Sequence, residues 1–303
     1  MVGIVVGFAA RVVSGVLLTA LVAGCSGSGG GARETGVVAG PAVAAEESLT
    51  VLREWAERHN RAVTSEDVEP WQDAVTGALE APVTARARRF GKLPKSARIS
   101  LANPVFYVPR QSEYPRWFGV AALERSGGGD RQVLGVFVKE DAAGGWRAAH
   151  WLTFKGRPPQ LARDKEGYVP AVSESGLPKA HARYLGGDDD ALIPDSYTSN
   201  ARDQEMGDWT VERGAVTPGP GESYALRTED GGALVWYAVK EEKTLAGGEA
   251  STLPEEVRVH LEKNGEEPGE TVQTTWQWLV IGYAPESGKG RVLGESVSLV
   301  AAR

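Results

Sequence analysis

The stretch EESLTVLREWAERHNRAV, residues 46–63, decides how the folded part of this sequence begins. Its apolar side chains recur every three or four positions, and most of the positions between them are charged. Because this spacing brings the apolar groups to one face of a helix, the stretch predicts an amphipathic α-helix.

Two shorter helices and a meander of strands are expected to follow. Pro70 suits the first position of a helix, which we expect to continue to Leu79, and a third helix is expected over residues 83–89. Beyond Pro94 the apolar period changes from about 3.6 to about 2, and the turns are rich in glycine, which is typical of antiparallel strands. The strands are predicted at residues 97–108, 116–125, 132–140 and 146–154.

The second half repeats the order of helix before strands. Residues 156–177 contain three prolines and little periodicity, and we interpret them as the connection. A helix is predicted over residues 178–185. Strands are predicted at residues 209–217, 223–228, 233–243, 255–262, 271–283 and 291–302. The whole pattern predicts an α+β fold with helices packed on curved antiparallel sheets, in two domains at residues 46–165 and 177–303.

The N-terminal segment is predicted to be a targeting signal. Residues 1–24, MVGIVVGFAARVVSGVLLTALVAG, contain an apolar run that is too short for a permanent membrane helix, which needs about 20 apolar residues. Small residues precede Cys25, the single cysteine of the chain, and in this segment the sequence resembles bacterial lipoproteins with a lipobox. The resemblance implies that residues 1–24 are removed and that Cys25 carries a diacylglyceryl group. An ordinary secretory signal with a chance cysteine is the alternative.

The composition fits a protein held at a membrane by its lipid. Residues 25–45 are rich in Gly, Ala and Ser and are expected to form a flexible tether. Two acyl chains on Cys25 would anchor the chain stably, since one chain alone binds only marginally. We therefore expect a lipid anchor at the extracytoplasmic face of the cell membrane. With 33 Lys+Arg against 40 Asp+Glu, the chain lacks the basic excess of nucleic-acid-binding proteins, so nucleic acid is not an expected partner.

The first folded half resembles a known family. The stretches EWAERHNRA (residues 54–62) and WQDAVTGAL (residues 71–79), followed by a meander, resemble the opening of nuclear transport factor 2-like, cystatin-like domains in actinobacterial lipoproteins. The resemblance implies a cone-shaped domain with a pocket between helices and sheet. No matching Asp/His constellation is present, so no catalytic residue is carried over from the family.

Two histidines and an acidic run are candidate site residues. His59 lies four residues after Trp55 on the apolar face of the first helix, and it either faces a pocket or is a core histidine with a hydrogen-bond partner, which we favour. The same alternatives apply to His150, which is expected to share a strand face with Trp146. The aspartates of residues 188–190, with Asp195, can attract a cation, but a solvated acidic turn is favoured.

Nine tryptophans suggest either a carbohydrate platform or a large core. Residues two apart in a strand share a face, so Trp276 and Trp278 are expected side by side, whereas Trp146 and Trp151 are expected on opposite faces. Burial is favoured, because tryptophan is highly buried on average. Gln277 is then expected on the solvated face.

The known catalytic motifs are missing from the sequence. It has no G-x-S-x-G, H-E-x-x-H, P-loop or dinucleotide fingerprint, and its four histidines are too dispersed for a local zinc site. We therefore predict no catalytic residue, metal or cofactor, and a non-catalytic binding or assembly module of the cell envelope, with an envelope protein or a small apolar ligand as partner. The alternatives are a carrier of lipid or another apolar ligand, and an extracytoplasmic enzyme with a dispersed site.

Overall fold

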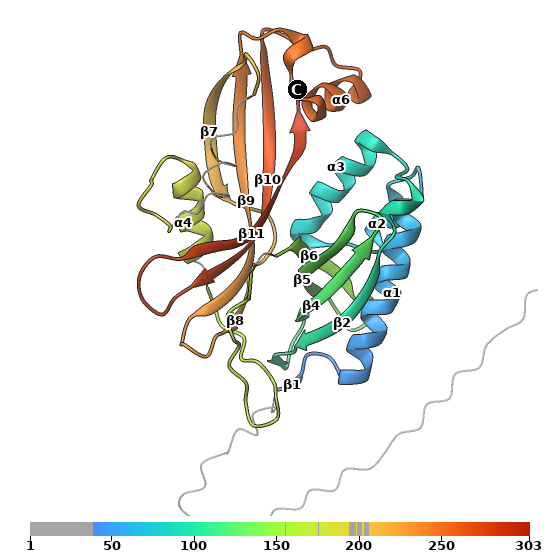
Figure 1. Ribbon diagram of the computed structural model, residues 1–303, viewed down its shortest axis with the longest axis vertical. Helices are drawn as coiled ribbons and strands as arrows, with labels where there is room; N and C mark the ends of the chain where they lie inside the picture. Colours follow the sequence, from blue (N-terminus) through green and yellow to red (C-terminus); the bar gives the residue numbers. More distant parts are fainter. Residues whose placement is uncertain (1–38, 155, 175, 194–197, 199–201, 203–205) are drawn as a thin grey trace, which may run out of the picture. The chain divides into compact units, whose positions relative to one another are not determined.

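The first helix of the fold is the predicted amphipathic helix (Figure 1). In this computed structural model, which describes residues 39–303 except 155, 175, 194–197, 199–201 and 203–205, it forms α1 (Ala45–Val63) and buries Trp55 to 1% exposure. Acidic Glu46 and Glu47 lie in its first turn, where they complement the partial positive charge of the helix start. The helix predicted over residues 83–89 is also confirmed, as α3 (Glu80–Phe90).

The helix predicted from Pro70 to Leu79 is wrong beyond its first turn. The helix α2 (Glu69–Gln72) ends after four residues, and the chain then pairs with a strand. The N–H of Ala148 donates to the carbonyl of Ala74 (3.0 Å), and the N–H of Thr76 donates to the carbonyl of Ala148 (2.9 Å). Because each backbone group must be satisfied once it is buried, pairing with the strand replaces the helical hydrogen bonds. A single 3-10 turn, η1 (Gly77–Leu79), leads into α3.

The first sheet confirms the predicted meander. Its strands are antiparallel in the order β2-β4-β5-β6. Their bounds are β2 (Ser100–Tyr107), β4 (Arg116–Ser126), β5 (Gly129–Lys139) and β6 (Arg147–Thr153). One face packs on α1, where Trp55 meets Phe137 edge to face with ring centroids 5.4 Å apart. A separate pair, β1 (Gly40–Pro41) and β3 (Arg110–Gln111), includes residues from the predicted tether, so the fold begins before residue 45.

The faces predicted for Trp146 and Trp151 are wrong, because strand β6 contains a bulge. The register with β5 shifts at Ala149, and an extra residue moves every later side chain to the other face. Trp146 and Trp151, which were expected on opposite faces, therefore both contact α1. The ring of Trp151 lies 4.3 Å from that of Trp55, and Trp146 Nε1 donates to a carboxylate of α1 (2.9 Å). His150 points to the opposite side, so its expected face-sharing with Trp146 is wrong.

The second sheet confirms five of the six predicted strands. Its order is β11-β10-β9-β7, with β8 also paired to β9, and all pairs are antiparallel. The strands are β7 (Thr210–Pro218), β8 (Tyr224–Arg227), β9 (Ala233–Ala246), β10 (Thr271–Ala284) and β11 (Arg291–Ala302). The predicted helix before them is α4 (Gly176–Leu185), which packs on β9 through a contact of 3.1 Å between His181 Nδ1 and the hydroxyl of Tyr237.

The strand predicted over residues 255–262 is wrong, because this segment is the helix α6 (Glu255–Asn264). Its apolar residues alternate, but Val257 and Leu261 are also four apart and are the two that become buried. Acidic residues lie in the first turn, and Gly265 ends the helix in the left-handed conformation at φ 70°. The residues that favour a helix start and end, together with the spacing of four between Val257 and Leu261, outweigh the strand-like alternation of apolar residues.

The segment that connects the two halves forms backbone hydrogen bonds with β8. The N–H groups of Ala162 and Val172 donate to Arg227 O and Ala225 O, each at 3.0 Å. This pairing gives the proline-rich segment backbone partners, and its described residues form isolated bridges to β8 and its neighbour Thr228 without a strand of their own.

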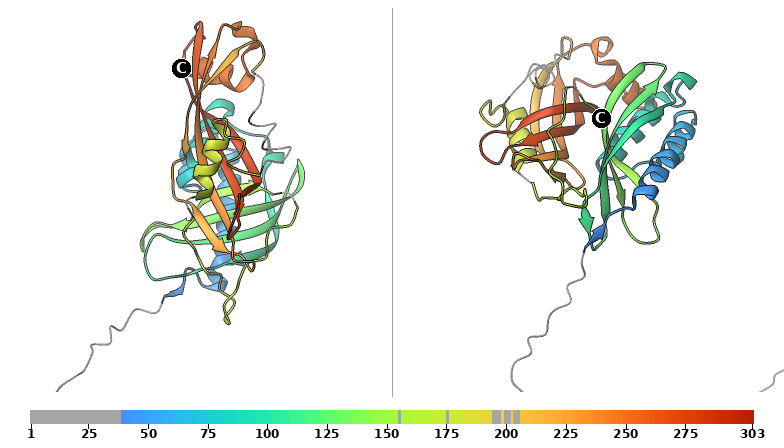
Figure 2. Two further views of the ribbon diagram at one scale, coloured as in Figure 1. Left: turned by 90° about the vertical axis from the view of Figure 1, so that its left-hand side faces the viewer. Right: turned by 60° about the horizontal axis from the view of Figure 1, so that its bottom comes forward.

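The two sheets share one core. In the right-hand view of Figure 2 the green first sheet lies between the blue α1 and the orange second sheet. Trp236 of β9 and Leu279 of β10 belong to the same buried cluster as Trp55. The described residues accordingly belong to one compact unit, and the division into two domains stays a prediction.

For β10, the prediction that its two tryptophans are buried is confirmed, and the prediction that Gln277 is solvated is wrong. Trp276 and Trp278 are buried, at 2% and 0% exposure, so they form core volume and not an exposed platform. Gln277 is also buried, and the expectation that it is solvated is wrong. Its side-chain amide donates to Ala78 O, because η1 of the first half covers this part of the sheet.

Candidate functional site

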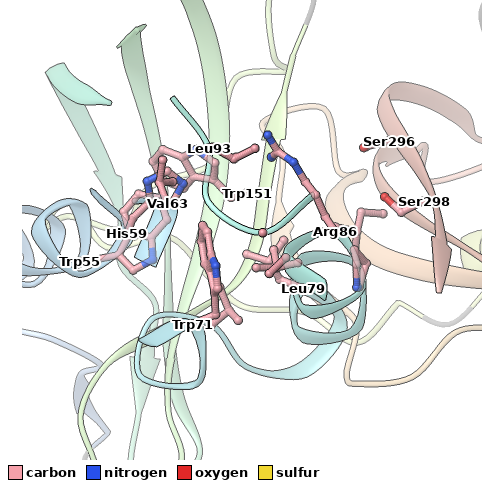
Figure 3. A pocket seen from close by; sticks show the side chains of 16 residues that line it. Trp55, His59, Val63, Trp71, Leu79, Arg86, Leu93, Trp151, Ser296 and Ser298 are labelled. Atoms are coloured by element: carbon pink, nitrogen blue, oxygen red, sulfur yellow. The ribbon is translucent and has the colours of Figure 1, made fainter. Parts of the chain in front are cut away.

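A cavity of about 240 Å³ lies where α1, α2 and α3 meet strands β6, β10 and β11 (Figure 3). Both residues predicted for a pocket, Trp55 and His59, line it. The helices contribute most of the wall, and the strands contribute Trp151, Leu279, Ser296 and Ser298. Interiors of proteins are close-packed, so a space of this size is a candidate site.

Aromatic rings form one side of the cavity. His59 stacks edge-on against Trp71 with centroids 5.1 Å apart, and its ring lies 5.4 Å from that of Trp55. Trp55 is fixed in turn by a hydrogen bond from Nε1 to Ala74 O (3.0 Å). The wall therefore offers flat apolar surfaces whose positions are set by packing and hydrogen bonding.

His59 is neutral at neutral pH. Burial lowers its pKa from 6.5 to about 4, because the surrounding rings replace the water that would solvate an imidazolium. Its Nδ1 is buried, and no described residue forms a hydrogen bond with it. The hydrogen-bond partner that a satisfied core histidine requires is thus missing at Nδ1, and the ring lies on the wall of a cavity.

A buried carboxylate positions Trp151. Glu124 is 4% exposed, and its Oε2 accepts a hydrogen bond of 2.7 Å from Trp151 Nε1, while its other oxygen forms an ion pair with Arg131. Both oxygens are therefore engaged behind the aromatic wall. Sequence reasoning missed Glu124, although its place on the apolar parity of β4, after Phe118, Val120 and Ala122, was a usable signal.

Arg86 of α3 brings a positive charge to the cavity. It lies between the aromatic group and the two serines of β11 (Figure 3). No hydrogen bond or ion pair joins Arg86 to any other described residue. Partial desolvation and the charge of Arg131 lower its pKa. Sequence reasoning missed Arg86 too, although it falls four residues after Pro82 and three after Val83, which also line the cavity.

The other predicted site residues lie elsewhere. His150 is fully buried between the sheets, 5.8 Å from the ring of Tyr224. The carboxylates of residues 188–190 each pair with a cation, at Arg183, Arg202 and Lys289, which is consistent with the favoured surface turn. Asp195 lies outside the described residues.

Cys25, the signal peptide and most of the predicted tether also lie outside the described residues. Within the described part of the chain, no helix is long and apolar enough to cross a membrane. In the same part, His, Cys, Asp and Glu side chains form no group of three that could hold a metal ion.

Comparison with known proteins places the chain in a family. A family model described as a domain of unknown function, DUF8094, matches residues 39–303. The chain belongs to the DUF8094 family. A Streptomyces coelicolor protein named as an uncharacterized lipoprotein is 27% identical over 296 residues, which cover 87% of this chain and 86% of the relative. That name agrees with the prediction of a bacterial lipoprotein.

The match to the DUF8094 family begins at residue 39, which is also the first residue that the structure describes. No solved structure matches this chain. The resemblance of its first half to nuclear transport factor 2-like domains stays a prediction.

Proposed function

We propose that this protein is a lipoprotein of the extracytoplasmic face of the cell membrane, anchored through Cys25, whose folded part binds a small molecule in the cavity beside His59. The lipobox-like segment and the lipoprotein relative support the anchor. The cavity supports the binding role, and it is the observation on which the proposal depends.

The cavity has the features of a ligand site. Most of the residues that line it are apolar or aromatic, and His59, Arg86, Ser296 and Ser298 add polar groups to its surface. Ligand sites are typically concave and apolar, with a small number of polar groups that orient the ligand. Closed cores instead fill such space with side chains.

A non-catalytic role fits this chemistry better than an enzymatic one. A histidine that acts as a general base is normally oriented by a hydrogen bond to its second ring nitrogen, but Nδ1 of His59 has no partner among the described residues. The nearby carboxylate of Glu124 is engaged by Trp151 and Arg131. The site can therefore hold a molecule, and it lacks an assembled acid–base pair.

The size of the cavity favours a small ligand over a membrane lipid. An engineered cavity of about 150 Å³ holds benzene, so this cavity accommodates roughly ten carbon atoms. The two acyl chains of a phospholipid are several times larger. The carrier alternative is thus restricted to small apolar compounds.

Thermal unfolding in the presence of indole tests the binding role. We expect indole to raise the melting temperature of the full chain, since a ligand that binds only the folded state stabilises it by mass action. Val83→Phe, which places a ring in the cavity, should remove this shift. The same change at Val105, an exposed position of β2, should leave it intact. An equal shift in both variants would place binding outside the cavity and contradict the proposal.

A further inference from the structure

The cavity contains a guanidinium that no described residue neutralises. Arg86 has no ion pair or hydrogen bond within the described chain, whereas the neighbouring Arg131 is paired with Glu124. Guanidinium stays charged at all physiological pH values, so the cavity carries a permanent positive charge. A concave site with apolar walls concentrates the potential of such a charge.

The other groups in the cavity do not offset this charge. His59 is neutral at neutral pH, because burial holds its pKa near 4. Ser296 and Ser298, which lie beyond Arg86 as seen from the tryptophans (Figure 3), are uncharged hydroxyl donors. In the described part of the chain, the carboxylate beside the aromatic wall is that of Glu124, and its oxygens are bonded to Trp151 and Arg131. Among the described residues, a negative group on a ligand would therefore meet the unpaired cation of Arg86 and no identified opposing anion.

The apolar and aromatic residues of the wall favour an aromatic ring as the uncharged part of the ligand. Trp71 and Trp151 present ring faces and edges, with Leu79 and Leu279 beside them. Aromatic rings pack favourably in offset or edge-to-face arrangements against other rings. The volume of about 240 Å³ suits one ring with a short side chain, since a cavity of about 150 Å³ holds benzene alone.

We propose that the cavity binds a small aromatic carboxylate, with its ring against Trp71 and Trp151 and its carboxylate on the guanidinium of Arg86. This assignment rests on the proposed function, because it requires that the cavity binds a small molecule. The planar guanidinium matches a carboxylate through two parallel hydrogen bonds. Trp151 is held in place for this contact by its hydrogen bond to Glu124.

Calorimetric titration with cinnamate and cinnamamide tests the assignment. The two probes share ring, length and shape, and they differ in the charge that Arg86 would recognise. For the full chain in detergent we expect cinnamate to bind at least about tenfold more tightly than cinnamamide, as charge-assisted hydrogen bonds are about twice as strong as neutral ones. The preference should weaken as salt is added.

Variants of α3 identify the group responsible. Arg86→Gln should remove the preference for cinnamate while cinnamamide still binds, and Arg86→Glu should make cinnamamide the tighter ligand. Arg88→Gln, at an exposed position of the same helix, is the matched control and should retain the preference. Because Arg86 is exposed and unpaired, its variants should unfold at the temperature of the parent, which the same samples report.

The outcomes separate the two proposals. Equal affinity for cinnamate and cinnamamide, or a preference that survives Arg86→Gln, would overturn the carboxylate assignment and leave the binding role standing. Failure of cinnamate, cinnamamide and indole alike to bind would overturn both.

Discussion

Replacing His150 by leucine should make the protein more resistant to acid, and the size of the effect follows from the burial of the ring. His150 is fully buried, and neither of its ring nitrogens has a hydrogen-bond partner among the described residues. Burial lowers its pKa from 6.5 to about 3, since the imidazolium would be left without water or a counter-ion. In the unfolded chain the same ring titrates near 6.5.

The sign of the pH dependence follows from this difference. The folded protein binds its proton on His150 only well below pH 6.5, while the unfolded chain binds it as the pH falls through 6.5. The contribution of the neutral ring is therefore complete above pH 6.5 and is lost progressively as the pH falls toward 3. Each pH unit below 6.5 costs about 1.4 kcal/mol, so between pH 7.5 and pH 5.0 the loss is about 2 kcal/mol.

Denaturant unfolding followed by tryptophan fluorescence measures this quantity. The free energy of unfolding is determined for the parent chain and for His150→Leu at pH 7.5 and pH 5.0. The effect of the substitution on packing is the same at both pH values, so it cancels when the change in free energy of unfolding between the two pH values is compared for parent and variant. The titrations of His59 and His181 occur in both proteins and cancel in the same comparison. We expect the parent to lose about 2 kcal/mol more than the variant between the two pH values.

A half-buried histidine supplies the control. His260→Leu, on α6, should change the pH dependence less, because the ring of His260 is only partly desolvated. A difference below about 0.5 kcal/mol between the parent and His150→Leu would refute the reasoning, since it would show that His150 titrates as a solvated ring.

Three further outcomes are expected. Cys25→Ser should abolish labelling by a fatty-acid analogue and release the chain from the membrane fraction, and label that persists on the variant would contradict the lipid anchor. Glu241→Gln should lower the free energy of unfolding by about 3 to 5 kcal/mol, measured by denaturant titration. The reason is that Lys243, which is buried and lies 3.3 Å from the carboxylate of Glu241 in the parent protein, loses its counter-ion. In the same titration, Glu242→Gln, at the exposed neighbouring position, should change the free energy of unfolding by less than about 0.5 kcal/mol. Gly265→Ala should cost about 1 kcal/mol in that assay, as alanine is strained at φ 70°, and no loss would show that the end of α6 has another conformation.

Much of the fold was predictable because its signals are local. The amphipathic period of residues 46–63 and the glycine-rich turns between alternating segments specify α1 and the meander within a few residues of their observed bounds. The alternation of residues 255–262 was a weaker signal, because its apolar residues fit a strand and a helix equally well. There, the proline before the segment and Gly265 after it carried the deciding information.

The candidate site was only partly predictable. The spacing of Trp55 and His59 placed both on one helix face, and both line the cavity. Arg86 lies on another helix, and the two serines of β11 come from residues more than two hundred positions later. Nothing in the periodicity of one segment states which distant segment it will meet.

The sequence by itself determined which segments are helices and strands for most of their length and which faces are apolar, and it carries the prediction of where the chain is addressed. Only the tertiary structure decided that Gln277 is covered, that Trp146 and Trp151 share a face, and that Arg86 meets the aromatic wall with no counter-ion among the described residues. The physical reason is that periodicity and turn chemistry act over a few residues. Burial and pairing depend on which surfaces pack together, and a one-residue bulge or a single covering turn is enough to change them.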